Sequence, residues 1–338
     1  MKEKLYKILA LLLVTLSTGC GGGNEGEVVV YTSVDQVFAE PILHDFERET
    51  GIKVKAVFDT EETKSTGVLN RLIAEANNPQ CDLFWSGDPV RANVLKQKGI
   101  SQPFSPEAAQ TIPGHFIDEE KHWTGFSSRA RVLIYNKDLL PANQVPTSIF
   151  DLTKEEYRGK VTVANPLFGT TSFHMAAIFA ALGDEQAKKW LDDLKANNVV
   201  IATSNGDVKK RVANGEVWLG LTDTDDANEA MKEGAPIGVV FLGQQDIGTL
   251  IIPNTLSLIK GSPNPEEAQR LANYLMSEET QLKLAHSSAQ MPLSKGVEVP
   301  EGVFSLDKVK PMRVDYDKSS KKLEEIQPYL KEWVETNM

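Results

Sequence analysis

Residues Glu27–Phe58 read EVVVYTSVDQVFAEPILHDFERETGIKVKAVF and predict a strand, a helix and a second strand in succession. Glu27–Tyr31 is a run of β-branched residues typical of a buried strand, and Ile52–Phe58 has the same character. Val37–Glu49, between them, carries apolar residues at helical spacing. This order predicts two parallel strands connected by a helix, which is the repeating unit of an α/β fold.

The same alternation continues toward the C-terminus. A helix that starts within Thr63–Gly67, a strand at Cys81–Trp85 and a helix at Arg91–Lys98 extend the first α/β set. Trp123–Asn136 then predicts a long strand or a strand pair. We therefore expect a mostly parallel sheet with helices on both faces, followed by a second set of the same kind. The later predictions are strands at Lys160–Ala164, Val199–Ile201, Glu216–Leu221, Val239–Leu242, Gly248–Ile252 and Ser257–Ile259, and helices at Thr170–Leu182, Glu185–Asn197, Gly206–Asn214, Pro265–Ser277, Glu279–His286 and Ser320–Glu335.

Length and composition argue against several classes of protein. A chain of 338 residues is too long for one compact core and suits two α/β lobes. Its net charge of −11, from 36 basic and 47 acidic residues, disfavours binding to nucleic acid or to an anionic membrane through bulk charge. Two cysteines cannot form a disulfide framework or a zinc finger. Cys81 lies within an apolar run, and we expect it to be a buried packing residue.

The N-terminus has the features of an export signal. Residues 1–19 combine a basic start, the apolar run Ile8–Leu16 and small residues before Cys20, and the run is too short to span a bilayer. With the Gly-rich residues 20–26, the segment resembles a bacterial lipoprotein signal, although Ser17 stands where such signals usually have leucine. We expect residues 1–19 to be removed as a signal peptide, Cys20 to carry a lipid anchor and residues 20–26 to form a flexible tether. The alternative is a plain secretory signal and a secreted protein with an incidental cysteine.

Several short motifs occur in order along the rest of the chain. They are Val28–Ser33, Phe46–Val54, Asn78–Leu83, Gly125–Asn136, Tyr157–Val161, Trp190–Asn197, Ile252–Thr255 and Lys260–Pro263. In this order they resemble the type 2 periplasmic solute-binding proteins of ABC importers, and most of all the ferric-iron-binding branch of that family. The resemblance covers residues 27–338 and implies a two-lobe periplasmic-binding-protein fold. Each lobe would be a mostly parallel sheet flanked by helices, with a ligand held in the hinged cleft between them.

The resemblance also implies a division of the chain and a role for it. Residues 27–130 with 248–338 would form lobe 1, and residues 131–247 would form lobe 2. A ligand that contacts both lobes would stabilise the closed form, which then docks on an ABC permease and its ATPase. We expect a monomer in the periplasm or on the cell surface, attached to the membrane only by its lipid, that delivers a small charged solute. A lipoprotein that senses a ligand for a receptor is an alternative.

The chain lacks the residues with which iron-binding relatives hold Fe(III). Those proteins typically use two adjacent tyrosines, a histidine in the first ligand loop and a nearby carboxylate, and an anion such as carbonate fills the remaining positions. Here the loop Tyr31–Gln36 contains no histidine, and no two of the seven tyrosines are adjacent. Thr222–Asp226 stands where the tandem tyrosines would fall. The tyrosine-based iron site is therefore absent from the sequence.

Hydroxyl residues at the ends of strands and the starts of helices are candidates for binding an anion. Hydroxyl groups and free backbone N–H groups at a helix N-terminus attract negative charge. Arg129, at a position that resembles the anion-contacting arginine of the family, would add a guanidinium group. The same hydroxyls could instead serve only as helix caps. These candidates are Ser33, Ser65, Thr66, Thr170 and Thr171, together with Arg129.

Acidic residues are candidates for binding the positive part of a ligand. Thr222–Asp226 places three carboxylates within four residues at a strand end, where they would repel one another unless a cation lies among them. Asp223 and Asp225 are therefore candidate ligands for a metal ion or an amine, although capping of the following helix explains part of the cluster. Asp35, in the loop after the first strand, is a further candidate. A metal ion with its anion fits such a cleft, and so does a phosphonate, an aminophosphonate or another small organic anion or zwitterion.

Common motifs of enzymes are missing from the chain. It contains no GxSxG elbow, no Walker A loop and no GxGxxG dinucleotide loop. Asp223 and Asp225 could in principle do acid–base chemistry, but nothing places a nucleophile or a leaving group between them. We therefore expect a binding protein without a cofactor, and an exported enzyme that uses these paired carboxylates is the rival hypothesis.

Overall fold

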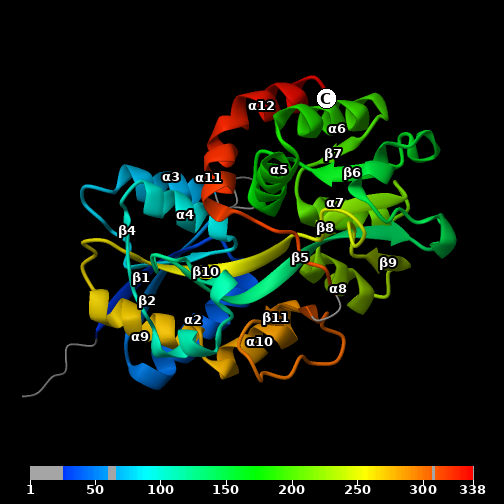
Figure 1. Ribbon diagram of the computed structural model, residues 1–338. Helices are drawn as coiled ribbons and strands as arrows, with labels where there is room; N and C mark the ends of the chain where they lie inside the picture. The colour runs from blue at the N-terminus through cyan, green and yellow to red at the C-terminus, as the bar shows by residue number, and fades with distance from the viewer. Residues whose placement is uncertain (1–25, 60–65, 307–308, 338) are drawn as a thin grey trace, which may run out of the picture.

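The computed structural model describes residues 26–59, 66–306 and 309–337, in which strands and helices alternate along much of the chain (Figure 1). The strands are β1 (Glu27–Thr32), β2 (Lys53–Phe58), β3 (Leu83–Ser86), β4 (Ser101–Gln102), β5 (Thr124–Asn136), β6 (Val161–Ala164), β7 (Val200–Ala202), β8 (Leu219–Asp223), β9 (Ile237–Val240), β10 (Ile251–Ile259) and β11 (Met291–Pro292). The α-helices are α2 (Gln36–Thr50), α3 (Thr66–Ala74), α4 (Pro89–Gln97), α5 (Gly169–Leu182), α6 (Asp184–Ala196), α7 (Asn205–Ala213), α8 (Thr224–Lys232), α9 (Pro265–Leu275), α10 (Glu278–Ser288), α11 (Tyr316–Glu325) and α12 (Gln327–Glu335). Short 3₁₀ helices span Glu107–Thr111, Gly114–Phe116, Ala142–Gln144, Ile149–Thr153 and Glu155–Tyr157.

The first α/β set forms the sheet of one lobe. β1 pairs in parallel with β2 on one side and with β3 on the other, and β10 runs antiparallel to β3. Val28 and Val30 of β1 are fully buried and share an apolar cluster with Phe46 of α2. The β-branched run thus forms a central strand because its side chains are covered by the helix that follows it.

The second α/β set forms the sheet of the other lobe. β6 lies between β8 and β7 and is parallel to both. Phe173 and Phe179 of α5, Trp190 of α6 and Leu221 of β8 are buried in a common apolar cluster. These helices therefore cover a parallel sheet, as the alternation of elements in the sequence predicts.

β5 is shared by the two lobes. Its first part pairs antiparallel with β10, with Ser127 opposite Asn254, and its last part pairs antiparallel with β8, with Leu133 opposite Leu221. β5 and β10 accordingly run through the middle of the molecule, with one lobe on either side (Figure 1). Since a single continuous strand belongs to both sheets, the two lobes are tied together along it.

The two C-terminal helices lie against helices of both lobes. α11 packs on α4 and on α5 (Figure 1). Trp333 of α12 donates a hydrogen bond from its indole nitrogen to the carbonyl of Leu191 in α6, at 3.0 Å. The division into residues 27–130 with 248–338 and residues 131–247 stays a prediction, and these contacts join its lobe 1 segment to its lobe 2 helices.

Most of the predicted elements are present, within a few residues at each end, and three predictions are wrong in detail. The strands predicted at Gly248–Ile252 and Ser257–Ile259 are one strand, β10, which continues through Pro253. β3 pairs only with the part of β10 from Thr255 onward, so Pro253 has β5 on one side and no β3 partner on the other. The N–H that proline lacks is therefore tolerated at this position. The helix predicted at Ser320–Glu335 is two helices, because Pro328 lies in the first turn of a new helix, α12, which begins at Gln327.

Two further predictions have a clear outcome. The strand predicted at Val239–Leu242 is β9, which begins and ends two residues earlier. Cys81 is completely buried, as expected, and burial raises the pKa of its thiol. Within the described part of the chain, no helix has both the length and the apolar character needed to cross a membrane. The predicted signal peptide, Cys20 and nearly all of the tether lie outside the described residues.

Gly220 of β8 allows α7 to approach the second sheet, and its replacement tests this packing. A Cβ at Gly220 would lie 2.5 Å from Cγ1 of Val208 and 2.9 Å from Cγ2 of Val212, both on stiff β-branched side chains. We expect Gly220→Ala to lower the free energy of unfolding by about 1–3 kcal/mol, measured by urea denaturation. Gly114→Ala is the matched control, since its Cβ would meet nothing within 4 Å. Equal stability of the two variants would contradict this packing.

Candidate ligand-binding site

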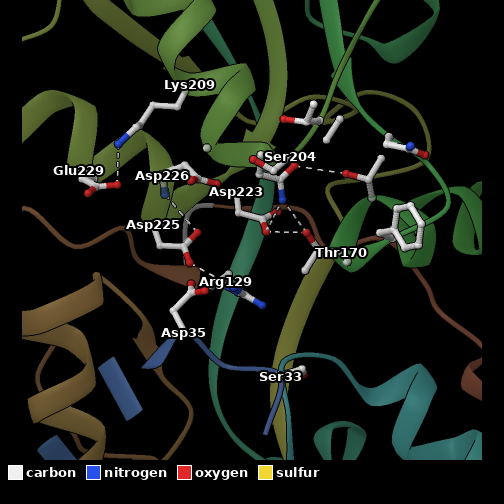
Figure 2. Close-up of a pocket in the computed structure, with 18 of the residues that line it drawn as sticks. Ser33, Asp35, Arg129, Thr170, Ser204, Lys209, Asp223, Asp225, Asp226 and Glu229 are labelled. Carbon is white, nitrogen blue, oxygen red and sulfur yellow. Dashed lines mark hydrogen bonds and ion pairs between the residues drawn. The ribbon is translucent and has the colours of Figure 1, made fainter. Parts of the chain in front are cut away.

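A cavity of about 330 Å³ lies between the lobes (Figure 2). The loop after β1 and the middle of β5 form one wall. The starts of α5, α7 and α8 form the other. The lining residues are Ser33, Asp35, Val37, Phe38, Arg129, Ala164, Asn165, Phe168, Gly169, Thr170, Thr171, Thr203, Ser204, Asn205, Gly206, Lys209, Lys210, Asp223, Asp225, Asp226 and Glu229.

The cavity brings together most of the residues that the sequence suggests for a ligand site. Thr66 begins α3 and is not among the described residues that line the cavity, and Ser65 lies outside the described residues. Figure 2 shows Ser33 and Asp35 on the side of the first lobe and the acidic residues after β8 on the other side. The predicted residues that line the cavity are Ser33, Asp35, Arg129, Thr170, Thr171, Asp223 and Asp225.

Arg129 of β5 connects the two walls. Its Nη1 donates to Oδ2 of Asp225 at 3.1 Å, and its Nη2 donates to the carbonyl of Gly87 at 2.9 Å. Gly87 in turn donates its backbone N–H to Oγ of Ser33, and a Cβ at Gly87 would lie only 3.2 Å from Nη2 of Arg129. Burial opposes the charge of Arg129, but Asp225 and Asp223 raise its pKa above the ordinary value. Its buried Nε has no hydrogen-bond partner among the described residues.

A second buried arginine, Arg131, holds Asp223. The two residues are opposite one another in the β5–β8 pairing, and Nη1 of Arg131 donates to Oδ1 of Asp223 at 2.8 Å. The other carboxylate oxygen, Oδ2, accepts hydrogen bonds from the hydroxyl of Thr170 at 2.6 Å and from the amide of Asn205 at 3.2 Å. This network fixes the starts of α5 and α7 to the end of β8.

The two neighbouring aspartates have opposite pKa shifts. Burial alone would raise the pKa of Asp223, but the charges of Arg131 and Arg129 and the hydrogen bond from Thr170 lower it below the ordinary value. Burial raises the pKa of Asp225, and the negative charges of Asp223 and Asp35 add to this, while Arg129 opposes it. Asp225 is therefore the carboxylate of this pair that takes up a proton more readily.

The acidic cluster already has positive and hydrogen-bonding partners within the protein. Carboxylate oxygens of Asp223, Asp225 and Asp226 lie within 4.8 Å of one another. Arg131 and Arg129 neutralise the first two, and Oδ2 of Asp226 accepts a hydrogen bond from Thr222 at 2.7 Å. The repulsion that the sequence predicts is thus relieved by two arginines of β5, without an added cation.

Three helix N-termini meet at the cavity. α5 begins after Phe168, which offers no side-chain cap to the first backbone N–H groups of the helix, and Gly169, Thr170 and Thr171 of its first turn line the cavity. α7 is capped by Ser204, and α8 begins after Asp223. An anion is stabilised at such helix ends by free N–H groups and by the helix dipole.

Several residues that line the cavity, or that hold a lining residue in place as Arg131 does, were not selected from the sequence. Arg131 could have been found, because it lies two residues from Arg129 on the same strand and so on the same face. Asn205 is the first residue of α7, whereas the sequence predicts that this helix starts at Gly206, one residue later. Lys209 is buried and paired with Glu229 at 2.6 Å, whereas Lys210 is exposed at the cavity. The side chains of these two lysines meet the cavity only because α7 is docked on β8, which no local pattern reveals.

His174 is a buried histidine that lies close to this network. Burial lowers its pKa to about 3, and the charge of Arg131 adds to this effect. It is therefore neutral at physiological pH. It is not among the described residues that line the cavity, so nothing links it to the ligand directly.

Comparisons with known proteins agree with this architecture. Residues 42–308 match the model of a family described as bacterial extracellular solute-binding protein. The chain is 27% identical over 308 residues to iron uptake protein A1 of Synechocystis sp., covering 88% of this chain and 84% of that protein. It is 28% identical over 301 residues to a Salmonella typhi protein provisionally named a 2-aminoethylphosphonate-binding periplasmic protein, covering 86% of this chain and 85% of that one. The iron-bound structure of HitA from Pseudomonas aeruginosa superposes with a TM-score of 0.83 at 23% identity, over 90% of this chain and 99% of HitA, which shows the same two-lobe fold.

The ion pair between Arg131 and Asp223 predicts a pH-dependent loss of stability on mutation. At pH 7, Asp223→Asn should lower the free energy of unfolding by about 3 kcal/mol, because it leaves a buried arginine without its counter-charge. The pKa of Asp223 is lowered by folding, so its charge stabilises the native state above the ordinary carboxyl pKa, and this contribution is lost as the pH falls through the folded-state value. The difference between wild type and variant should therefore shrink in acid, as measured by urea unfolding from pH 7 to pH 3.

The control is Asp193→Asn on α6, which removes an exposed ion pair with Lys189. We expect little change in stability at any pH, because exposed pairs contribute little. A loss at Asp223→Asn that stayed constant down to pH 3 would contradict the role given to its charge.

Proposed function

Because the chain belongs to the family of bacterial extracellular solute-binding proteins, we propose that it is the solute-binding component of an ABC importer. It captures a small charged solute in the cavity between its lobes and passes it to a membrane permease and its ATPase. The relatives named above are uptake and periplasmic binding proteins, which supports a transport role over an enzymatic one. Contacts from both walls to one solute would favour the closed form, since such a ligand binds that form more tightly.

The solute that fits the cavity best is a small zwitterion, such as an aminophosphonate. One observation carries this proposal: buried Arg129 and partly buried Asp225, two groups of opposite charge, lie 3.1 Å apart in the wall of the cavity. An anionic group can bind at the start of α5, next to Thr170, Thr171 and the guanidinium of Arg129. An ammonium group can bind Asp225, next to Asp226 on the same wall, and Asp35 adds negative charge from the opposite wall.

A neutral solute fits this site less well. A neutral solute would bury the Arg129–Asp225 pair further without supplying a charge to either residue, so the two side chains would compensate only each other. A zwitterion replaces the Arg129–Asp225 ion pair by two new ones, between its anionic group and Arg129 and between its ammonium group and Asp225. Each charge therefore keeps a partner. The Salmonella relative, which is named for 2-aminoethylphosphonate, supports this class of ligand.

The second candidate is a metal ion with an accompanying anion. The observation that favours it is the group of three aspartates with oxygens within 4.8 Å of one another, because hard cations prefer such oxygen ligands. Iron-binding relatives support it as well. Against it, no tyrosine or histidine is among the described residues that line the cavity, and Arg129 and Arg131 already occupy two of the three carboxylates. A cation would have to compete with both arginines.

Two features of the mature protein belong to the same proposal. Lobe movement would occur about the connecting strands β5 and β10, near the predicted crossings at Ser128–Tyr135 and Gly248–Ile252. Cys20, after cleavage of residues 1–19, would carry a lipid that anchors the monomer at the membrane surface, with residues 20–26 as the tether. The periplasmic location of relatives supports export, and without the lipid the protein would be secreted.

Binding of 2-aminoethylphosphonate tests the ligand class. We expect it to raise the free energy of unfolding by about 2.7 kcal/mol at a hundred times its Kd, measured by thermal shift together with calorimetric titration. Asp225→Asn should weaken 2-aminoethylphosphonate at least about tenfold, since it removes the partner of the ammonium group. The same variant should change the weaker affinity for ethylphosphonate, which lacks the amine, by less than about twofold.

Other outcomes separate the candidates. Stabilisation by Fe(III) with carbonate, and not by any phosphonate, would support the metal ion in place of the zwitterion. A response to neutral sugars alone would overturn both. Equal weakening of the two phosphonates by Asp225→Asn would show that the variant disturbs Arg129 and does not report on an amine.

The lipid anchor has its own test. Cells that express the full chain and are labelled with radioactive palmitate should incorporate the label into the protein and hold it in the membrane fraction. Cys20→Ser should abolish labelling and release the protein, while Cys81→Ser, which alters the buried cysteine, should leave labelling unchanged. A soluble, unlabelled wild-type protein would contradict the anchor and indicate plain secretion.

A further inference from the structure

Arg91 is a fully buried arginine that does not line the ligand cavity. It belongs to the first turn of α4, and its side chain is 1% exposed. Its Nη1 donates to Oδ2 of Asp88 at 2.7 Å, and Asp88, at 0% exposure, also caps α4 by accepting from the backbone N–H of Arg91. Within the first lobe, the charge of Arg91 is therefore neutralised by the residue that starts its own helix.

The same guanidinium reaches across to the second lobe. Its Nη2 donates to Oγ of Ser172 at 2.7 Å, and its Nη1 also donates to the carbonyl of Gly169 at 3.3 Å. Both acceptors belong to the first turn of α5, and Gly169 lines the ligand cavity. Ser172 donates its own hydroxyl proton to the carbonyl of Gly169 at 2.8 Å, which makes this turn a single hydrogen-bonded unit.

Two adjacent residues of the first lobe, Gly87 and Asp88, hold two arginines that contact the second lobe. The carbonyl of Gly87 accepts from Arg129, which forms the cavity wall, and the carboxylate of Asp88 holds Arg91, which binds the start of α5. Gly87 and Asp88 are consecutive, so the peptide unit between them links the position of α5, held through Arg91, to the position of Arg129. A shift of α5 relative to Arg91 would change the distance between the two walls of the cavity.

The lobes also meet at a second place, where the contacts are of a different kind. Lys232 of α8 donates to the carbonyl of His286 in α10 at 3.4 Å, in an exposed position. Asn228 of α8 donates to the carbonyl of Gly302 at 2.9 Å. Neither contact contains an ion pair. Water can replace the exposed contact of Lys232 at little cost, and the partly buried contact of Asn228 involves only neutral groups. Separating Arg91 from α5, in contrast, would leave a buried charge with fewer hydrogen bonds.

We propose that Arg91 is a positioning residue that anchors the first turn of α5 to α4 across the boundary between the lobes. It keeps the anion-binding end of α5 in register with Ser33 and Arg129, while the α8–α10 contacts part and re-form as the lobes move. The binding role of α5 rests on the function proposed above. The anchoring itself does not, and it is measurable without a ligand.

Hydrogen exchange in the ligand-free protein tests the anchor. The backbone N–H of Ser172 donates to the carbonyl of Phe168 at 3.1 Å and closes the start of α5. Arg91→Met removes the guanidinium but keeps an unbranched side chain. We expect exchange of residues 169–176 to become at least tenfold faster in Arg91→Met, with the first turn of α8 unchanged. Ser172→Ala, which removes one acceptor and leaves the Arg91–Asp88 pair intact, should give a smaller effect at the same place.

Asn93→Ala is the matched control. Asn93 lies on α4, and its side-chain amide donates to Asp317 at 2.8 Å and to Ser320 at 2.9 Å, both on α11. This variant should leave exchange at residues 169–176 unchanged. Uniform acceleration in Arg91→Met across the whole chain, or none at α5 in either Arg91→Met or Ser172→Ala, would overturn the proposal.

Binding of 2-aminoethylphosphonate adds a second readout. Arg91→Met should lower its affinity at least tenfold, Arg91→Lys should recover part of this loss, and Asn93→Ala should stay within twofold of wild type. Faster exchange at α5 with unchanged affinity would overturn the positioning role. If 2-aminoethylphosphonate does not bind the wild-type protein, the proposed ligand class fails, while the exchange experiment still decides whether Arg91 anchors α5.

Discussion

The pairing of β5 with β8 determines where charge is buried in this protein. Arg131 stands opposite Asp223 in that antiparallel register, and Arg129, two residues earlier on the same face, meets Asp225 just beyond the end of β8. A slip of one residue would turn both arginines to the opposite face of the sheet and leave buried carboxylates without partners. The cost of such unpaired charges makes the register highly specific, and the cavity walls depend on it.

This arrangement links the fold to binding. β5 belongs to both sheets, so the arginine that contributes to the first lobe's wall and the arginine that organises the second lobe's wall come from one strand. Arg131 holds Asp223, which in turn holds Thr170 and Asn205 at the starts of α5 and α7. On the second lobe's wall, helix ends, hydroxyls and charges are therefore held at the cavity by a hydrogen-bonded network. Such preorganisation reduces the entropy that a ligand must lose on binding.

Much of the fold could be predicted from the chain. The β-branched run of β1 and the amphipathic helix after it are local signals, and they locate an α/β unit correctly. The errors came from proline. Pro253 continues a strand where the flanking pairing allows it, and Pro328 divides a helical pattern that is periodic throughout. Whether proline interrupts an element depends on its neighbours in space, which the local pattern does not contain.

The sequence by itself determined the residue types of the candidate site and their order: hydroxyls before helices, aspartates after a strand and an arginine on the strand between the lobes. It also determined that the tandem tyrosines of an iron site are absent. Only the tertiary structure decided which charges neutralise one another. Arg131 and Asp223 are 92 residues apart in the chain, and Arg91 and Ser172 are 81 apart. Such pairs form because strand register and helix packing bring distant segments together, and the desolvation cost of a buried charge then makes a partner necessary.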